Sequence, residues 1–548
     1  MSKNLSELSG RKGLVDNLFE RIGELSKDNG SPSTTDLETL ANEFLIGKAN
    51  TYGTMSFYDF TKPENKNKKV YICNGSACLC AGKQPAVKEK LLEFYPENEI
   101  GHMTCLGRCH ENAAFNIDGN NYSGNDIQHI NEISRYQQKT HEKYKVGGNK
   151  MVLTQPDKGI SHFVDLLKKA ITTPKETLLA DLKLSGLRGR GGAGFPMAMK
   201  WEFCMKEEND TKFIICNADE GDPGAYSDRY LLEQAPFSVL FGMMVGGFIM
   251  GAKWGVVYIR AEYPEATNIT QEAIDTLRDL KLLGTNILDS GFDFDFKIIK
   301  AQGAYICGEE TALINSIEGQ RPEVRTRPPF PAQKGLFNKP TTVNNVETLA
   351  SVMWIVENGG AAYKKLGTEK SSGTKLVSLD SFFNNPGIYE VEMGTPLSNV
   401  INEMGGGFKE PVKAMHIGGP LGGIVPVSKI DSLNIDFESF AQSGFMLGHA
   451  SVVCIPSKFP MIQYLEHLME FAAYESCGKC FPCRLGTTRG QELFHKAIHE
   501  DYKINKELLF DLLDTLQKGS LCAHGGGIPL PVRNAFEFFG EELAAFME

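Results

Sequence analysis

The sequence predicts an α/β protein built from several domains. Its 548 residues are 41% hydrophobic, which is enough for three or four domains of roughly 150 residues each. Short apolar runs typical of buried strands, such as 213–216 and 255–259, lie among helix-like runs. Two groups of cysteines, one toward each end, flank a glycine-rich loop at 185–196. The chain therefore has three separate candidate sites.

The composition and the apolar pattern exclude some classes of function. The formal net charge is -11, so the chain lacks the basic surface that nucleic-acid binding requires. The most apolar stretch, 237–250, falls short of the ~20 residues of a membrane span, and we expect a buried glycine-rich helix followed by a core strand at 255–259. Residues 1–8 show no signal peptide, which predicts a cytoplasmic protein with reduced thiols.

The N-terminal part begins with helix-spaced apolar residues that predict a helical bundle over 1–65. A polar linker at 61–68 leads to a strand at 69–72, a helix at 86–95 and a strand at 113–117, which together indicate a small α/β module. The charged stretch 136–150 is expected to be a connector. The apolar positions of the bundle are Leu14, Leu18, Ile22, Leu25, Leu37, Leu40, Phe44 and Leu45.

The first cysteine group lies in this module and offers four thiolates for one iron–sulfur cluster. The spacing of Cys73 and Cys78 resembles the first spacing of plant-type 2Fe-2S ferredoxins, whereas the spacing of Cys105 and Cys109 departs from that pattern. Cys80 is interpreted as a bystander or substitute ligand. A disulfide is the alternative, and the odd total of 13 cysteines and the missing signal peptide weaken it. The four candidate ligands are Cys73, Cys78, Cys105 and Cys109.

The glycine-rich loop at 185–196 can bring backbone N–H groups and arginines close to a phosphate. It contains the spacing Gly189-x-Gly191-x-x-Gly194, but we reject a dinucleotide-binding Rossmann turn. Such a turn follows a strand and opens a helix, whereas residues 176–184 are helix-like and Pro196 closes the loop. A purely structural glycine turn is the alternative.

Four further segments accompany the loop, at 213–224, 304–311, 327–331 and 341–348. Their carboxylates suit ribose hydroxyls, their amides suit a heteroaromatic ring, and their aromatic faces suit stacking on adenine or nicotinamide. Each segment alone is more often a turn or a helix cap. Their joint presence, upstream of a second cysteine group, favours a nucleotide site.

The second cysteine group supplies four thiolates at a spacing typical of a 4Fe-4S cluster. Three closely spaced cysteines can cover one face of the cluster, and a distant fourth can close the site. A structural zinc site is the alternative, although zinc sites usually have two separated pairs of ligands. The candidate ligands are Cys477, Cys480, Cys483 and Cys522. The isolated Cys204, Cys216, Cys307 and Cys454 are expected to be buried small hydrophobes.

Residues 150–548 resemble the NADH-binding flavoprotein subunit of respiratory complex I and the diaphorase subunits of NAD-dependent formate dehydrogenases and NAD-reducing hydrogenases. Residues 1–140 resemble the family's separate thioredoxin-like 2Fe-2S subunit, so the chain looks like a natural fusion. The motifs that carry the resemblance are Gly186-Leu-Arg-Gly-Arg-Gly-Gly-Ala-Gly-Phe-Pro, Cys216-Asn-Ala-Asp-Glu-Gly-Asp-Pro-Gly, Gly303-Ala-Tyr-Ile-Cys-Gly-Glu-Glu-Thr-Ala, Asn344-Asn-Val-Glu-Thr and Glu475-Ser-Cys-Gly-Lys-Cys-Phe-Pro-Cys-Arg.

The resemblance implies five domains. These are an N-terminal helical bundle (1–65), a thioredoxin-like 2Fe-2S domain (66–140), a Rossmann-like domain that binds FMN and NADH (150–370), a β-grasp domain (371–440) and a helical 4Fe-4S domain (441–548).

The resemblance also implies the residues that hold the cofactors. FMN would be bound by Gly189, Arg190, Gly191, Gly192, Lys200, Asn217, Asp219, Glu220, Gly308, Glu309, Asn344 and Asn345. NADH would be bound by Phe195, Phe203, Tyr305, Glu310, Arg327 and Phe330. Asp222 stands where many members have Glu, and Arg327 where many have Lys. Both keep their charge, so we expect altered affinity rather than lost activity.

The implied function is that of a diaphorase subunit, an NADH dehydrogenase or NAD-reducing oxidoreductase subunit. It would exchange hydride between NAD(H) and FMN and relay single electrons through the two clusters. No side chain need act as a general acid or base, although Glu220 and Asp222 would flank the reacting groups. The expected partners are iron–sulfur and catalytic subunits of a larger redox complex.

The parent complex is expected to be a soluble NAD-dependent formate dehydrogenase or an NAD-linked hydrogenase. The alternatives are complex I and an electron-bifurcating enzyme. Two other classes are weighed against these: a scaffold that has lost its cofactors, which the complete ligand sets disfavour, and a redox sensor, which the lack of a DNA-binding pattern disfavours.

Overall fold

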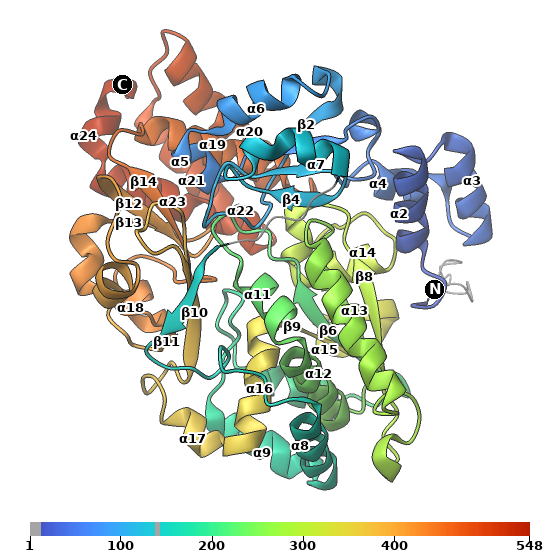
Figure 1. The fold of residues 1–548 in the computed structure, drawn as a ribbon. Helices are drawn as coiled ribbons and strands as arrows, with labels where there is room; N and C mark the ends of the chain where they lie inside the picture. The colour runs from blue at the N-terminus through green and yellow to red at the C-terminus, as the bar shows by residue number, and fades with distance from the viewer. Residues whose placement is uncertain (1–12, 137–142) are drawn as a thin grey trace.

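The computed structural model describes residues 13–136 and 143–548 (Figure 1). The start of the predicted helical bundle, the signal-peptide interpretation and part of the predicted connector therefore lie outside the described residues. The described chain contains three β-sheets of four, six and four strands. The expected mixed α/β architecture is confirmed at this level.

The N-terminal helices pack on one side of the molecule (blue in Figure 1). They are α2 (Leu18–Asn29), α3 (Thr34–Glu43) and α4 (Lys48–Met55). Asn17 caps α2 by accepting hydrogen bonds from the backbone of Phe19 and Glu20, and its Nδ2 donates to the Ile317 carbonyl at 2.8 Å. Leu18, Ile22, Leu37, Leu40 and Phe44 share one apolar cluster, as their helical spacing predicts, whereas Leu45 is exposed.

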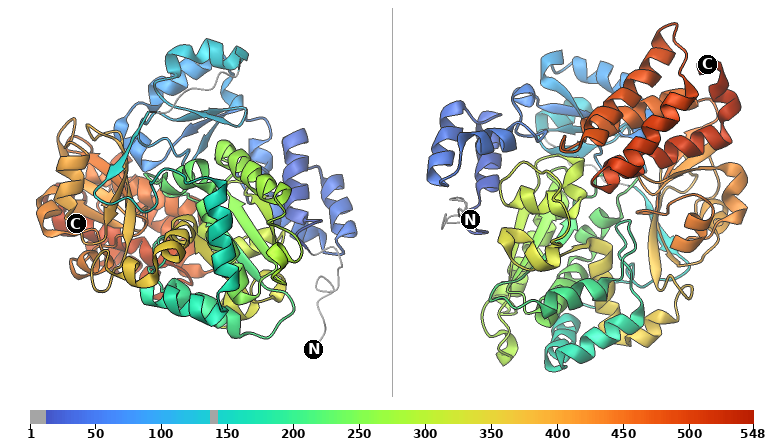
Figure 2. Two further views of the ribbon diagram at one scale, coloured as in Figure 1. Left: turned by 60° about the horizontal axis from the view of Figure 1, so that its bottom comes forward. Right: turned by 180° about the vertical axis from the view of Figure 1, so that it is seen from behind.

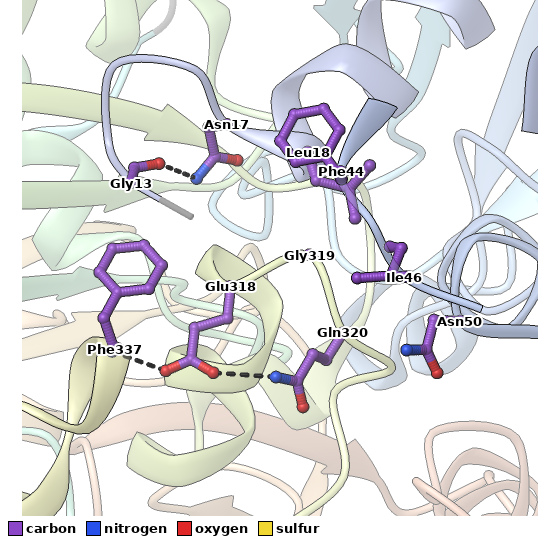
Figure 3. Close-up of a pocket in the computed structure, with 10 residues that line it drawn as sticks. All are labelled: Gly13, Asn17, Leu18, Phe44, Ile46, Asn50, Glu318, Gly319, Gln320 and Phe337. Atoms are coloured by element: carbon purple, nitrogen blue, oxygen red, sulfur yellow. Dashed lines mark hydrogen bonds between the residues drawn. The ribbon is translucent and has the colours of Figure 1, made fainter. Parts of the chain in front are cut away.

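A cavity of roughly 430 Å³, counting space open to solvent, lies where these helices meet the main body (Figure 3). Asn17, Leu18 and Phe44 line it on one side and Glu318, Gln320 and Phe337 on the other. None of the residues predicted to bind a cofactor lines this cavity.

The first cysteine group lies on a four-stranded sheet of order β2-β1-β3-β4. The central strand β1 is parallel to β2 and antiparallel to β3. The elements are β1 (Val70–Cys73), β2 (Ile100–Met103), β3 (Phe115–Ile117), β4 (Asn120–Tyr122), α5 (Ser76–Ala81), α6 (Gln84–Leu92) and α7 (Ile130–Tyr136). The predicted strands and helix of the small α/β module are confirmed.

The central part contains a four-stranded sheet of order β8-β7-β6-β9 in which all pairings are parallel. Its strands are β6 (Phe213–Ala218), β7 (Trp254–Ile259), β8 (Asp295–Lys300) and β9 (Thr341–Asn345). The helices are α8 (Ile160–Thr172), α9 (Lys175–Ser185), α10 (Met197–Lys206), α11 (Ser227–Gln234), α12 (Pro236–Met250), α13 (Pro264–Asp279), α14 (Glu310–Ile317), α15 (Pro331–Lys334), α16 (Val346–Asn358) and α17 (Gly360–Lys364).

The apolar helix predicted at 237–250 is α12, and it is buried along most of its length. The core strand predicted after it is β7. Among the described helices no single one is long and apolar enough to cross a membrane. The pair α11 and α12, which meet at a bend of 93°, passes the same test of length and composition.

The third sheet has six strands in the order β13-β12-β14-β10-β11-β5. Its edge strand β5 (Lys145–Gly148) comes from the predicted connector and pairs in parallel with β11. The sheet includes strands from both sides of the predicted boundary at residue 440, because β14 lies between β12 and β10. The other elements are β10 (Thr374–Leu379), β11 (Gly387–Glu392), β12 (Val412–Ile417), β13 (Gly423–Pro426), α18 (Phe437–Gln442) and β14 (Ser451–Pro456).

The chain ends in a bundle of helices that packs on this sheet (red in Figure 2). The helices are α19 (Met461–Tyr474), α20 (Phe481–His499), α21 (Lys506–Gly519), α22 (Ala523–Gly527), α23 (Pro529–Phe538) and α24 (Gly540–Leu543). The bundle and the sheet share one apolar core.

Candidate functional site

The order of the parallel sheet reverses between β6 and β9. From β6 the chain proceeds outward to β7 and β8, and it then returns to place β9 on the other side of β6. Open α/β sheets bind ligands at such a switch point, beyond the carboxyl ends of the strands. Asn217 near the end of β6 and Asn344 and Asn345 at the end of β9 lie there. The sheet thus brings together amides that are more than a hundred residues apart in the sequence.

The glycine-rich loop closes over this switch point. It connects α9 to α10 and follows no strand, which confirms the rejection of a Rossmann turn. The backbone N–H of Arg190 donates to Thr348 Oγ1 at 2.9 Å, and a Cβ on Gly191 would come within 3.0 Å of the Asn345 Cβ. Gly192 has φ of +136°, and a Cβ at this position would have nothing within 4 Å, so the loop is open at that point.

The side chain of Arg190 does not point into this opening. It is fully buried, and its Nη2 donates to the Ser372 carbonyl at 2.5 Å and to Tyr363 Oη at 3.3 Å. Its Nε and Nη1 have no hydrogen-bond partner among the described residues. The guanidinium therefore anchors the loop on the side away from the opening.

Asn217 connects two of the predicted flavin segments. Its Nδ2 donates to the Gly308 carbonyl at 2.8 Å, and its Oδ1 accepts from the Asp219 backbone at 3.1 Å. The Asp219 carboxyl is buried 3.8 Å from Arg260, and its Oδ2 has no partner within the described residues. Burial raises the pKa of this carboxyl to about 8. An unpartnered buried oxygen at the switch point fits a site that a polar ligand completes.

A chain of ion pairs runs along the predicted nicotinamide-nucleotide segment. Glu310 lies between Lys200, at 3.0 Å, and Arg327, at 2.9 Å. The adjacent Glu309 caps α14 by accepting from the backbone of Thr311 and Ala312. The carboxylates of Glu309 and Glu310 thus already have partners within the protein. Of the two cations beside Glu310, Arg327 is more exposed than Lys200.

Three aromatic residues that were predicted to stack on NADH expose large apolar surface. Phe195 is 45% exposed, Phe203 46% and Phe330 54%. Phe195 precedes α10, Phe203 lies on α10, and Phe330 precedes α15, which packs against α10. Exposed rings on neighbouring elements are suited to stacking on a planar ligand.

A buried network that the sequence did not reveal lies beneath the acidic loop 219–224. Glu220 caps α11 by accepting from the backbone of Asp228 and Arg229 at 2.9 and 3.1 Å. His449, from the segment before β14, lies 3.2 Å from Asp228 and 3.6 Å from Glu220. Asn345 donates to the same Asp228 carboxylate at 2.6 Å. The two carboxylates raise the pKa of His449 to about 9 despite its burial.

Asp222 and Tyr305 join the acidic loop to the helical bundle. Tyr305 Oη donates to Asp222 Oδ1 at 2.7 Å, and its backbone N–H donates to Glu475 Oε2 at 2.8 Å. Its ring lies edge-on to Phe471 with centroids 4.9 Å apart. Burial raises the pKa of Asp222, and Tyr305 opposes this shift. Tyr305 is therefore a bridge between the switch point and the segment that precedes Cys477.

The first cysteine group converges in one buried cluster. Cys105 Sγ and Cys109 Sγ are 3.3 Å apart, and Cys73 interacts with both Cys78 and Cys105. The backbone N–H of Gly224 donates to Cys109 at 3.2 Å. All 13 cysteines are free thiols, which contradicts the disulfide alternative. Four converging sulfurs that accept backbone hydrogen bonds fit a 2Fe-2S cluster, and Cys80 packs in a different cluster.

The second cysteine group converges at the start of two helices. Cys480 and Cys522 precede α20 and α22, and Cys483 lies in the first turn of α20. Cys477 and Cys480 both interact with Cys483, and Cys522 with Cys477 and Cys483. Burial raises the pKa of Cys483 to about 11 and that of Cys522 to about 12. This donor set fits a 4Fe-4S cluster, which would favour the thiolates.

Each cysteine group contacts a different loop at the carboxyl edge of the parallel sheet. The loop after β6 reaches the first group, through Gly224. The segment after β8 reaches the second group, because Ile306 and Ala312 pack against Cys477. The carboxyl edge of the sheet is therefore in contact with both groups.

Sequence reasoning missed several residues of this site. Asp228 and His449 are buried charges that pair with each other across the sequence, and Arg260 is a buried charge that pairs with the nearby Glu262 and the distant Asp219. Glu475 stands out in the sequence only as the start of a cysteine motif. The sequence showed His449 only as a histidine in an apolar segment. Such a histidine is more often a hydrogen-bonded core residue than part of a functional site.

Comparison with known proteins places these features in a family. Residues 182–354 match the "Nuo51 FMN-binding domain" model, and residues 463–546 match the "NADH-ubiquinone oxidoreductase-F iron-sulfur binding region" model. The match to "NADP-reducing hydrogenase subunit HndC" of Solidesulfovibrio fructosivorans is 41% identical and covers 70% of this chain and 78% of that protein. A subunit of NADH-quinone oxidoreductase from Escherichia coli strain K12 is 38% identical, and the match covers 69% of this chain and 86% of that protein.

Two further comparisons extend over the N-terminal part. "NAD-reducing hydrogenase HoxS subunit alpha" of Cupriavidus necator is 33% identical, and the match covers 97% of this chain and 92% of that protein. A crystal structure of "NAD+-reducing [NiFe]-hydrogenase in the air-oxidized state" matches with a TM-score of 0.85 at 27% identity. This match covers 97% of this chain and 94% of the other.

Proposed function

Because this chain belongs to the family that includes the FMN-binding subunits of NADH-quinone oxidoreductase and the α subunit of NAD-reducing hydrogenase, we propose that it is a diaphorase subunit. It exchanges hydride between NAD(H) and FMN and relays electrons through a 4Fe-4S and a 2Fe-2S cluster to or from a partner subunit. The observation that carries the proposal is the carboxyl edge of the parallel sheet, whose loops contact two converging sets of four cysteines.

The chain's own residues bind and orient the reactants. The backbone of Gly189, Gly191 and Gly192 would hold the FMN phosphate, and the amides of Asn217, Asn344 and Asn345 would hold the ring and ribityl chain. When bound, FMN accepts the two electrons of a hydride and releases them one at a time to clusters that accept single electrons. The other FMN residues are Arg190, Lys200, Asp219, Glu220, Gly308 and Glu309, of which Arg190 and Glu220 act by holding the loops.

NADH is held on the exposed side of this cradle. Phe195, Phe203 and Phe330 stack on its planar groups, and Arg327 pairs with its phosphates while Glu310 and Tyr305 lie nearby. Support comes from the exposure of the three rings and from the ion pairs around Glu310. Arg327 can contact a phosphate with two parallel hydrogen bonds.

The clusters take Cys477, Cys480, Cys483 and Cys522 for 4Fe-4S, and Cys73, Cys78, Cys105 and Cys109 for 2Fe-2S. We expect Cys480→Ala to leave flavin bleaching by NADH intact and to slow electron exit to the partner. Cys204→Ala is a matched control, because Cys204 is buried in the same apolar core as the first group but away from both ligand sets. Electron exit at the normal rate in Cys480→Ala would contradict the assignment of the 4Fe-4S cluster.

The partner is the catalytic part of an NAD-reducing hydrogenase. The matches to NAD-reducing hydrogenase relatives cover 97% of this chain, whereas those to the quinone oxidoreductase relatives cover about 70% of it. The native complex, purified through this chain, is therefore expected to contain nickel by elemental analysis. Molybdenum or tungsten would instead indicate a formate dehydrogenase, and the absence of all three metals would favour complex I.

A further inference from the structure

A third group of metal-ligating side chains lies on the C-terminal bundle, outside the proposed redox site. It consists of His495 and His499 on α20 and Glu466 on α19. His495 Nδ1 is 2.7 Å and His499 Nε2 is 3.8 Å from the same carboxylate oxygen, Glu466 Oε1. One ligand atom from each residue lies within 4.8 Å of the others.

The helical repeat explains why these residues meet. His495 and His499 are four residues apart, so they lie on the same face of α20 one turn apart. Their ring centroids are 4.4 Å from each other. Helices α19 and α20 pack against each other, and this packing brings Glu466 opposite the histidine pair. The site is therefore built by two helices rather than by a loop.

Exposure and chemistry define the ligand. The two histidines are 51% and 54% exposed and Glu466 is 19% exposed, so an ion could enter from solvent and keep water in its remaining positions. Two imidazoles and one carboxylate suit Zn²⁺, Ni²⁺ or Cu²⁺, whereas Mg²⁺ and Ca²⁺ prefer oxygen ligands alone. We propose that His495, His499 and Glu466 form a binding site for a divalent transition-metal ion that bridges α19 and α20.

The position of this site gives it a structural role. Helix α19 ends just before Glu475 and Cys477, and α20 begins directly after Cys480. A bridging ion would therefore clamp the two helices that hold the three-cysteine segment between them. His495 lies twelve residues beyond Cys483, which is about 18 Å along the helix, so the ion would not share a ligand with the cluster.

The test uses the full chain loaded with its cofactors and purified without a histidine tag. Calorimetric titration with Zn²⁺ should show one tight equivalent per chain. His495→Gln, His499→Gln and Glu466→Gln should each weaken it by ~10-fold or more, and the double histidine variant should abolish it. His129→Gln is the matched control, because His129 is 61% exposed and lies beside one carboxylate, that of Glu132, at 3.7 Å.

Copper identifies the ligands independently of affinity. In the oxidised protein, where both kinds of cluster are EPR-silent, less than one equivalent of Cu²⁺ should show coupling to two imidazole nitrogens. His499→Gln should reduce this to one. Zinc binding and a copper spectrum that are both unchanged in the double histidine variant would overturn the proposal, whatever the outcome for NADH oxidation.

Discussion

His449 is a buried cation beside two buried carboxylates. Its imidazole is 5% exposed, and Glu220 and Asp228 lie on one side of it. Both carboxylates belong to the segment that forms the acidic loop and the first turn of α11. Removal of the cation would leave adjacent buried negative charges, which proteins tolerate poorly. His449 therefore positions the loop that separates the switch point from the first cysteine group.

We expect the stability contribution of His449 to depend on pH with a definite sign. Its pKa is raised from 6.5 to about 9 in the folded protein, so its contribution is complete below pH 6.5 and is lost as pH rises through about 9. A shift of this size corresponds to about 3 kcal/mol. Thermal unfolding of the wild type should lose more stability between pH 6.5 and 9 than that of His449→Gln. Parallel curves for the two proteins would contradict a charged His449.

Arg190 should act through stability rather than through charge at the flavin site. Arg190→Met keeps much of the buried volume but removes the hydrogen bonds to Ser372 and Tyr363, and we expect a loss of about 1–3 kcal/mol. Unfolding with denaturant and flavin titration would separate the effects. Flavin affinity that falls far more than stability would instead indicate direct contact with the phosphate.

At the scale of elements, helix caps and cofactor residues coincide. Glu220 caps α11, Glu309 caps α14 and Asn345 caps α16. The sequence left open whether such residues are helix caps or part of a nucleotide site. Their hydrogen bonds within the chain are those of helix caps. The caps lie around the carboxyl edge of the parallel sheet, where helix N-termini also favour anions. One side chain can therefore both end a loop and shape the site.

One helix cap also links the N-terminal helices to the main body. Asn17 caps α2 and also donates to the Ile317 carbonyl, so Asn17→Ala should cost about 1–2 kcal/mol and loosen these helices from the main body. Hydrogen exchange should rise in α2 and in the residues around Ile317. Ser33→Ala, which removes the exposed cap of α3, should raise exchange in α3 alone. Equal exchange at the junction in both variants would contradict the coupling.

At the scale of the whole molecule, the two cysteine groups belong to different packing units. The first lies in the apolar core shared with the central part, and Cys477 of the second lies in a small separate cluster. Their ligands do not overlap, so one cluster should assemble without the other. The central sheet contacts both through different loops, which makes it the common element of the relay.

Iron content should reveal this independence. Cys105→Ser should lower iron from about six atoms per chain to about four, and Cys483→Ser should lower it to about two. Cys80→Ser should leave it near six, because Cys80 lies in another apolar cluster. Iron analysis with EPR of the reduced protein measures each cluster separately. Loss of both clusters from either ligand variant would show that they assemble together.

Local patterns in the sequence were sufficient to predict the ligand chemistry and several elements. The spacing of the cysteines can be read within short stretches of sequence. The apolar runs of β6, α12 and β7 can be read in the same way, because each of these elements buries consecutive or regularly spaced residues. The helix before the glycine-rich loop was predictable for the same reason. The reversal of strand order, the inward turn of Arg190, the edge strand β5 and the pairing of His449 with Glu220 and Asp228 emerged from the folded chain alone. These features depend on contacts between residues far apart in the chain, where a buried charge takes whichever partner the packing provides.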